Sequence, residues 1–398
     1  MSYSPAGARR RVTDALPPRD ILVVLVVASA LRVYRYSSRT LLPIEFQTDE
    51  HVATLHYSGW HLVRLFVAEP TKDTHPPLYY AFIHVWRQIF GRSLASIRFP
   101  SLIFGVATVY VLYLLGTELR DRRTGLIAAV LAAISPFFVS VSQYARGYAL
   151  FALSISASWY FLLKFRSQVT GRNVGLYVVS TAIMSSIHVY GGFLVIGQWL
   201  YLGVDALRLH RLPIRRVLKL QVSAAIIASP VLIDIARLVA AHPNQGAAPH
   251  LTQPTAHVLS QSFQSYLGGQ FANLLPKLLL AVSAGLLLVS LLRWWRPRTR
   301  VLDSLVRRPS TQEVAVVACL GLPVVVFPVL LSILVLPMWD NAAAIGAALA
   351  LFLGLSLGVQ SLRNRWLRLT TLALLLGGNL VSLLHYSLLS RGLLVTIP

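Results

Sequence analysis

The sequence has few charged residues and almost no cysteine. Only 13% of its 398 residues are Asp, Glu, Lys or Arg, whereas a soluble domain has about 25%. The mean hydropathy is +0.64, and together these values exclude an ordinary soluble globular protein. The single cysteine, Cys319, lies in an apolar run, so no internal disulfide can form. Because no small-residue cleavage site follows the first apolar run, we expect no cleavable signal peptide.

Acidic residues are also scarce. The chain has 14 Asp and Glu against 36 Lys and Arg, which gives a formal net charge of +22. Such an excess can indicate a nucleic-acid partner. Here the basic residues lie in short segments between apolar runs, where membrane topology and lipid headgroups account for them, so we expect no nucleic acid. Nearly all of them are Arg rather than Lys, which suits phosphate binding and equally reflects a GC-rich genome.

Apolar runs of about 20 residues, long enough to cross about 30 Å of hydrocarbon, recur along the chain. They predict an all-α, polytopic transmembrane protein with about 11 spans, within a range of roughly 10 to 13. Placing the strongly basic loops on the cytoplasmic side orients these spans. The membrane is expected to be the cell membrane, with the C-terminus on its outer side.

The composition along the chain predicts three parts. Residues 1–20 read as a disordered, Arg-rich cytoplasmic tail. Residues 21–206 form a transmembrane module with an extracytoplasmic loop at 37–77 that carries short surface helices. Residues 207–398 form a C-terminal transmembrane module with a second extracytoplasmic loop at 241–276.

Several finer expectations follow from this topology. Residues 78–90 are predicted as the second span, and 174–206 are required to cross once, although the sequence alone also allows two short helices there. The arginines within 120–123 then lie outside, against the usual charge bias. Arg146 falls at a cytoplasmic break between spans.

The first loop holds a dense group of ionisable residues. Five of the 14 acids lie there, as do four of the 11 histidines: Glu45, Asp49, Glu50, Glu69 and Asp73, with His51, His56, His61 and His75. In a structural reading, Asp49 and Glu50 are first-turn acids of a helix capped by Thr48. The histidines lack a tight metal spacing and are better read as interfacial polar residues. A divalent metal is possible but not required by the sequence, and the cofactor is unknown.

In a functional reading, one of these carboxylates accepts the proton of a hydroxyl that attacks a lipid-borne electrophile. If the electrophile is a sugar linked through phosphate to a polyprenol, the leaving group is a weak base and no general acid is needed. One base, together with cations on the departing phosphate, suffices. Lys72, Arg98 and Arg146 are candidate cations, although such residues also snorkel or set topology.

The order of several motifs resembles the GT-C superfamily of membrane glycosyltransferases over about residues 20–200. The resemblance is closest to the branch of dolichyl-phosphate-mannose–protein mannosyltransferases and the lipid A aminoarabinose transferase. The matching pieces are, in order, Leu31-Arg32-Val33-Tyr34, Asp49-Glu50, His75-Pro76-Pro77-Leu78-Tyr79-Tyr80, Phe90-Gly91 with Arg98 and Gly105, Ser135-Pro136, and Ser142-Gln143-Tyr144-Ala145-Arg146-Gly147-Tyr148.

The resemblance implies an inverting transferase that moves a sugar from a polyprenyl-phosphate donor to an acceptor hydroxyl on a glycan, lipid or protein. Asp49 would be the general base, with Glu50 beside it. Donor or substrate contacts would come from residues near the first loop and its motifs: His75, Lys72, Asp73, Tyr79, Arg98 and Arg146.

The sequence departs from the family pattern at two places. Tyr144 stands where the family has an acid, and Pro337-Met338-Trp339-Asp340-Asn341 occupies the place of an Arg-Tyr pair near the donor phosphate. A non-catalytic GT-C relative is therefore one alternative. A lipid or sugar transporter or flippase is another, and it should show ionisable residues near the membrane midplane. Asp234 with Arg237 is the one plausible pair of that kind.

Overall fold

The computed structural model describes residues 18–34, 36–37, 78–241, 252–268, 274–295, 300–334 and 337–389. Within these ranges the regular elements are helices: α1 (Arg19–Val33), α4 (Leu78–Phe90), α5 (Leu94–Leu119), α6 (Arg122–Ile134), α7 (Pro136–Val141), α8 (Tyr148–Lys164), α9 (Gly171–Ile187), α10 (Tyr190–Val204), a π-helical turn η1 (Asp205–Leu209), α11 (Ile214–Ala241), α12 (Ala256–Gly268), α13 (Leu275–Trp295), α14 (Arg300–Leu305), α15 (Thr311–Gly321), α16 (Pro323–Leu334), α17 (Ile345–Ser361) and α18 (Arg365–Leu389). Extended pairing in the described residues is limited to two isolated bridges, Thr252 with Trp339 and Val306 with Leu362. The all-α prediction is confirmed.

Five helical stretches of the described residues are long and apolar enough to cross a membrane. They are Leu94–Leu119, Tyr190–Leu209, Leu275–Trp295, Thr311–Leu334 and Arg365–Tyr386. Shorter apolar helices accompany them at Tyr148–Lys164 and Ile345–Ser361. The chain is thus a multi-pass helical membrane protein.

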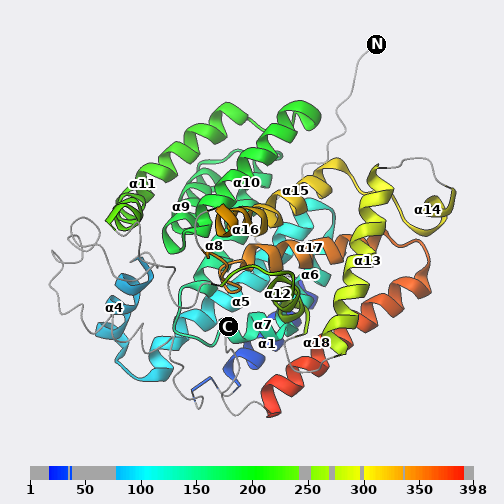
Figure 1. Cartoon of the computed structure of the whole chain (residues 1–398), viewed down its shortest axis with the longest axis horizontal. Coiled ribbons are helices and arrows are strands. Elements are labelled where there is room, and N and C mark those ends of the chain that lie inside the picture. Colours follow the sequence, from blue (N-terminus) through cyan, green and yellow to red (C-terminus); the bar gives the residue numbers. More distant parts are fainter. Residues whose placement is uncertain are drawn as a thin grey trace.

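Helices α5 and α17 lie inside the bundle, while α11 and α18 form opposite flanks in Figure 1. Helix α17 is buried along almost its whole length and packs against α6, α13 and α15. Helix α5 packs against α6 and α8. The α5–α6 approach depends on glycine, because a Cβ added at Gly116 would meet Gly125 Cα at 2.8 Å. Small residues permit such close backbone contact where no hydrophobic force drives helices together in lipid.

Ion pairs connect helix termini at one end of the bundle. Asp20, which opens α1, bonds Arg122 at the start of α6 at 2.6 Å. Glu118, in the last turn of α5, pairs with Lys164 at the end of α8 at 3.1 Å. The end that carries the pairs Asp20–Arg122, Glu118–Lys164 and Arg120–Glu313 is called the basic end below.

Hydroxyl and amide groups connect the opposite termini. The Tyr79 hydroxyl at the start of α4 lies 3.1 Å from Ser101 Oγ in α5. The Tyr148 hydroxyl at the start of α8 donates to Asp340, which precedes α17, at 3.0 Å. This end, which gathers Tyr79, Tyr80, Tyr148, Tyr190 and Asp340, is called the tyrosine end.

Helix α4 has the predicted bounds but does not connect the two ends. Its Trp86 donates to the Ser96 carbonyl at 2.9 Å, and Tyr79 reaches Ser101, so α4 folds back along the first turns of α5. Its 13 residues span about 20 Å, less than the hydrocarbon thickness of about 30 Å. The predicted span at 78–90 is therefore wrong. Arg120 and Arg122 consequently lie at the basic end rather than across the membrane from it.

Residues 174–206 also differ from the expected single crossing. They belong to two antiparallel helices, α9 and α10, whose Tyr177 and Gln198 are hydrogen-bonded at 2.9 Å. The predicted span at 78–90 added one crossing, and the predicted single crossing at 174–206 left one out. The two errors cancel, so the helices after α10 keep their predicted directions. Within the predicted loop 241–276, the structure places helix α12, whose Tyr266 contacts the tyrosine end through the Asn341 carbonyl at 2.9 Å.

A network of neutral hydrogen bonds connects the four helices α8, α9, α10 and α11 inside the bundle. Gln198 donates to Ser158 at 2.7 Å, and Gln221 donates to both Tyr177 and Gln198, at 3.0 and 3.1 Å. Ser158 is 2.8 Å from Thr181. Polar side chains satisfied in this way are tolerated in lipid and fix helix register.

Candidate functional site at the tyrosine end

The motif Ser142–Tyr148 forms the centre of the tyrosine end because the chain is irregular there between two helices. Ser135 caps α7, whose first residue is Pro136, and α7 ends at Val141. Helix α8 begins again at Tyr148. The intervening residues therefore do not continue a helical ladder, and their backbone and side-chain groups bond to other helices instead.

Arg32 fixes the end of α1 to this motif. Its guanidinium is fully buried and donates to Ser142 Oγ at 3.1 Å and to the Ala133 and Ala132 carbonyls at 3.2 and 3.3 Å. Those carbonyls lie in the last turn of α6, where helical partners run out. Gln143 completes the contact by donating to the Arg32 carbonyl at 2.8 Å. Rather than snorkelling, Arg32 locks α1 against the α6–α7 turn.

Arg146 lies next to the start of α4. Its Nη1 donates to the Tyr80 hydroxyl at 3.1 Å, and its guanidinium lies 6.0 Å from the centre of the Tyr148 ring. Only 2% of Arg146 is exposed, so its charge acts through a medium of low dielectric constant. The predicted topology put Arg146 across the membrane from Tyr79 and Tyr80. Because α4 does not cross, Arg146 instead shares an end with them.

Asp340 is a buried carboxylate on the other side of Tyr148. Its Oδ2 accepts from the Tyr148 hydroxyl, and His188 Nε2 lies 3.7 Å from the same oxygen. Its Oδ1 accepts the backbone N–H groups of Ala342 and Ala343, at 2.8 and 3.2 Å. These contacts satisfy a carboxylate that would otherwise be costly to bury.

Tyr190 fixes the segment that carries Asp340. Its hydroxyl donates to the Met338 carbonyl at 2.6 Å and accepts the Asp340 N–H at 3.1 Å. The segment 337–344 is thereby attached to α8, α9 and α10. A line of polar groups thus runs from Tyr80 through Arg146 and Tyr148 to Asp340.

The structure describes three of the predicted site residues. Tyr79, Arg98 and Arg146 all lie at the tyrosine end, brought there from α4, α5 and the 142–148 motif. Arg98, 1% exposed, donates from Nη1 to the Tyr36 carbonyl at 2.8 Å. The other predicted residues lie outside the described part of the chain: Asp49, Glu50, Lys72, Asp73 and His75.

Both chain ends that flank residues 38–77 emerge here. Tyr36 is bonded by Arg98, and Tyr79 is bonded by Ser101. The segment with the predicted base therefore leaves and rejoins the described structure at the tyrosine end.

Sequence reasoning did not select Tyr148, His188, Tyr190 or Asp340 as site residues. The signal was present, because each is a polar residue that interrupts an apolar run. What the sequence could not supply was their convergence from 3 segments far apart in the chain. Among the described residues, no group of 3 or more His, Cys, Asp and Glu is placed to hold a metal ion.

These features define a multi-pass helical membrane protein with the GT-C fold, as predicted. Residues 74–233 match the family model described as dolichyl-phosphate-mannose-protein mannosyltransferase. No curated protein matches the chain significantly.

Solved structures show the same fold at low sequence identity. ArnT from Cupriavidus metallidurans in the apo state has a TM-score of 0.57 at 13% identity, covering 85% of this chain and 59% of ArnT. ArnT bound to undecaprenyl phosphate has a TM-score of 0.56 at 14% identity, covering 88% and 62%. The oligosaccharyltransferase AglB from Archaeoglobus fulgidus, in complex with an inhibitory peptide and a dolichol-phosphate, has a TM-score of 0.54 at 14% identity, covering 94% and 56%. The chain thus spans less than two thirds of the length of each of these proteins.

Proposed function

We propose that this protein is a glycosyltransferase that moves a sugar from a polyprenyl-phosphate donor to an acceptor hydroxyl at the tyrosine end. The observation that carries the proposal is the meeting of Tyr79, Arg98 and Arg146 where both flanks of residues 38–77 emerge. This meeting occurs in a chain with the GT-C fold. The polyprenyl-phosphate donor is supported by the undecaprenyl phosphate in ArnT and the dolichol-phosphate in AglB.

In the proposed reaction, Asp49 removes the proton of the acceptor hydroxyl, which attacks the anomeric carbon from the side opposite the phosphate. The carbon–oxygen bond to phosphate breaks, and the polyprenyl phosphate leaves as a weak base, so the configuration inverts. Glu50 tunes or orients Asp49. Cations stabilise the charge that develops on the departing phosphate.

Of the proposed cations, Arg146 has the most direct support from its surroundings. It is buried between Tyr80 and Tyr148, in a place where an arginine interacts strongly with developing negative charge. Arg98 donates a hydrogen bond from Nη1 to the Tyr36 carbonyl. This bond positions the chain where it leaves α1. Lys72, Asp73 and His75 complete the proposed donor contacts.

We assign the reaction to the extracytoplasmic side of the cell membrane. The support is the charge bias: Arg120 and Arg122 join the other basic loops at one end, which the positive-inside rule places in the cytoplasm. The tyrosine end then faces outward.

The test is sugar transfer by purified protein in detergent, measured as release of polyprenyl phosphate from a panel of labelled polyprenyl-phosphate sugars. Asp49→Asn keeps the size of the side chain and removes proton acceptance, so transfer should fall roughly 10²-fold or more. Glu50→Gln should cost less. Glu45→Gln, a neutralised acid of the same segment, is the matched control and should stay near wild type. Near wild-type transfer by Asp49→Asn, or equal losses in all three variants, would refute Asp49 as the base.

A further inference from the structure

An apolar groove runs along the bundle between α13, α15–α16 and α17. Its cavity is about 420 Å³. The walls are formed largely by small or aliphatic residues, among them Val314, Ala318, Ala350 and Gly354. Along α17 the lining extends from Ala347 to Ser361, which is about 21 Å of helix. The groove is therefore long, narrow and of the shape of an extended hydrocarbon chain.

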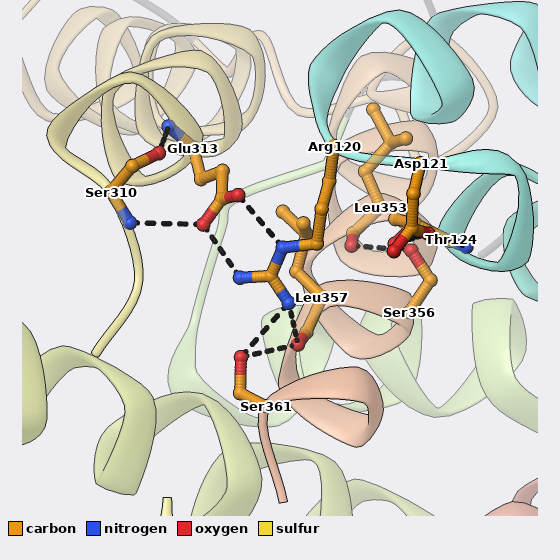
Figure 2. Close-up of polar contacts among 9 residues, drawn as sticks. All are labelled: Arg120, Asp121, Thr124, Ser310, Glu313, Leu353, Ser356, Leu357 and Ser361. Carbon is orange, nitrogen blue, oxygen red and sulfur yellow. Dashed lines mark hydrogen bonds and ion pairs between the residues drawn. The ribbon is translucent and has the colours of Figure 1, made fainter. Parts of the chain in front are cut away.

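The groove extends from the basic end towards the tyrosine end. Phe263 of α12 lines it at the far end, and Pro309, Glu313 and Ser361 line it at the basic end. Glu313 brings no free negative charge, because Arg120 Nε and Nη2 bind both of its oxygens at 2.7 and 2.6 Å (Figure 2). Arg120 also donates to Ser361 Oγ at 3.0 Å, as Figure 2 shows.

Exposed arginines lie on the two chain segments next to the mouth of the groove at the basic end. The bridge between Val306 and Leu362 sets two backbone segments side by side, with the Arg307 N–H donating to the Ser361 carbonyl at 2.7 Å. Arg307, Arg308 and Arg363 are exposed on these segments. Asp303, the acid that precedes these arginines in the chain, is already ion-paired with Arg293. The mouth is thus strongly positive.

We propose that this groove is a binding site for an anionic phospholipid of the leaflet at the basic end. One acyl chain would lie along α17 between α13 and α15, and the phosphate would contact Arg307, Arg308 and Arg363. Basic pockets between membrane helices recognise anionic headgroups in this way. The site differs from the donor site, because the donor phosphate has to react at the tyrosine end, beyond Phe263.

The test compares phosphatidylglycerol with phosphatidylcholine as bound lipids, counted by native mass spectrometry of the full chain in detergent. The wild type should retain phosphatidylglycerol in preference. Arg308→Gln should lower its affinity about fivefold, the effect of roughly one arginine near a phosphate. Arg215→Gln, an exposed arginine of α11 at the same end, is the matched control and should leave retention unchanged.

The groove itself is tested by filling it. Ala318→Trp should abolish retention of phosphatidylglycerol, whereas Ile226→Trp on the exposed face of α11, where Ile226 is 67% exposed, should not. Val314→Phe is a second, milder filling in case the tryptophan variant fails to fold. Equal retention of the two lipids, or retention unchanged by Arg308→Gln and by the filled grooves, would overturn the proposal. Displacement of phosphatidylglycerol by undecaprenyl phosphate would assign the groove to the lipid carrier instead.

Discussion

At the basic end, Asp20, Glu118 and Glu313 are each bonded to an arginine or lysine, whereas at the tyrosine end the carboxylate of Asp340 is contacted by one tyrosine hydroxyl, two backbone N–H groups and an imidazole. Closed ion pairs hold helices together, and the side chains engaged in them have little capacity left to bind anything else. Neutral donors around a buried carboxylate and a buried arginine can exchange partners at a smaller cost. We infer that the basic end mainly contributes stability and that the tyrosine end contributes chemistry.

The largest effect is expected from breaking the Arg120–Glu313 pair. Arg120→Met leaves a buried carboxylate without its cation, which should destabilise the protein by about 3–5 kcal/mol. Unfolding by SDS titration in mixed micelles measures this loss. Arg120→Met combined with Glu313→Leu should recover most of it, because no unpaired charge remains. Sugar transfer per folded molecule should be unchanged in both variants; a specific loss of transfer would contradict the division between the two ends.

A smaller effect, on transfer rather than stability, is expected at Arg146. Arg146→Gln removes a buried cation next to the proposed phosphate position, so transfer should fall roughly 10²-fold. Arg146→Lys, which keeps the charge but not the planar fork, should lie between. The matched control is Arg92→Gln, an exposed arginine at the same end. If Arg146→Gln destabilises the protein as much as Arg120→Met does, Arg146 is a structural residue. The proposed difference between the two ends would then be contradicted.

Tyr148→Phe tests how the tyrosine end supports Asp340. The variant deletes the hydroxyl that donates to Oδ2 and leaves the two backbone N–H donors on Oδ1. A hydrogen bond to a charged group contributes about 1.5–3 kcal/mol, so a loss towards the lower end is expected in the same SDS titration. Tyr110→Phe, on α5, is the control. No change in stability would show that Asp340 does not depend on Tyr148.

The smallest effect is expected at the exposed pair Asp20–Arg122. The hydrogen bond from Arg122 lowers the pKa of Asp20 below its usual 3.8. A lowered pKa in the folded state stabilises the protein above the unfolded pKa, and this contribution is lost as the pH falls through the folded pKa. Asp20→Asn should therefore be slightly less stable than wild type near pH 7, and the difference should disappear as the pH falls through the lowered pKa of Asp20. Unfolding curves at several pH values measure this, and a difference that grows in acid would contradict it.

Much of this arrangement could be predicted from the sequence. The apolar runs gave the all-α membrane class, and helix bounds such as 78–90 followed from Pro77 and the Gly91 turn. Whether a helix crosses the membrane could not be predicted in the same way. A short apolar helix that packs on a neighbour, such as α4, has the same composition as a membrane span. The polar and glycine residues at 188–192 likewise fit either a broken helix or a hairpin. Only the packing of Gln198 in α10 against Tyr177 and Gln221 decides between them.

The candidate site was predictable only where a motif was continuous in sequence. Ser142–Tyr148 could be recognised, and Arg146 with it. The partnership of Tyr148 with Asp340 joins residues 192 positions apart, and it follows from the docking of helices that no local pattern records. Arg32 shows the same limit: the sequence places it near the end of a helix, but its bonds to the last carbonyls of α6 follow only from packing.

The two predicted modules are clamped to each other at both ends of the bundle. Arg120 of the first module holds Glu313 and Ser361 of the second at the basic end, and Tyr148 of the first holds Asp340 of the second at the tyrosine end. An alternating-access transporter has to open one end while it closes the other, which here would break a buried ion pair or expose a buried carboxylate in every cycle. These contacts keep the two modules together, so substrates have to reach the tyrosine end without separating the modules.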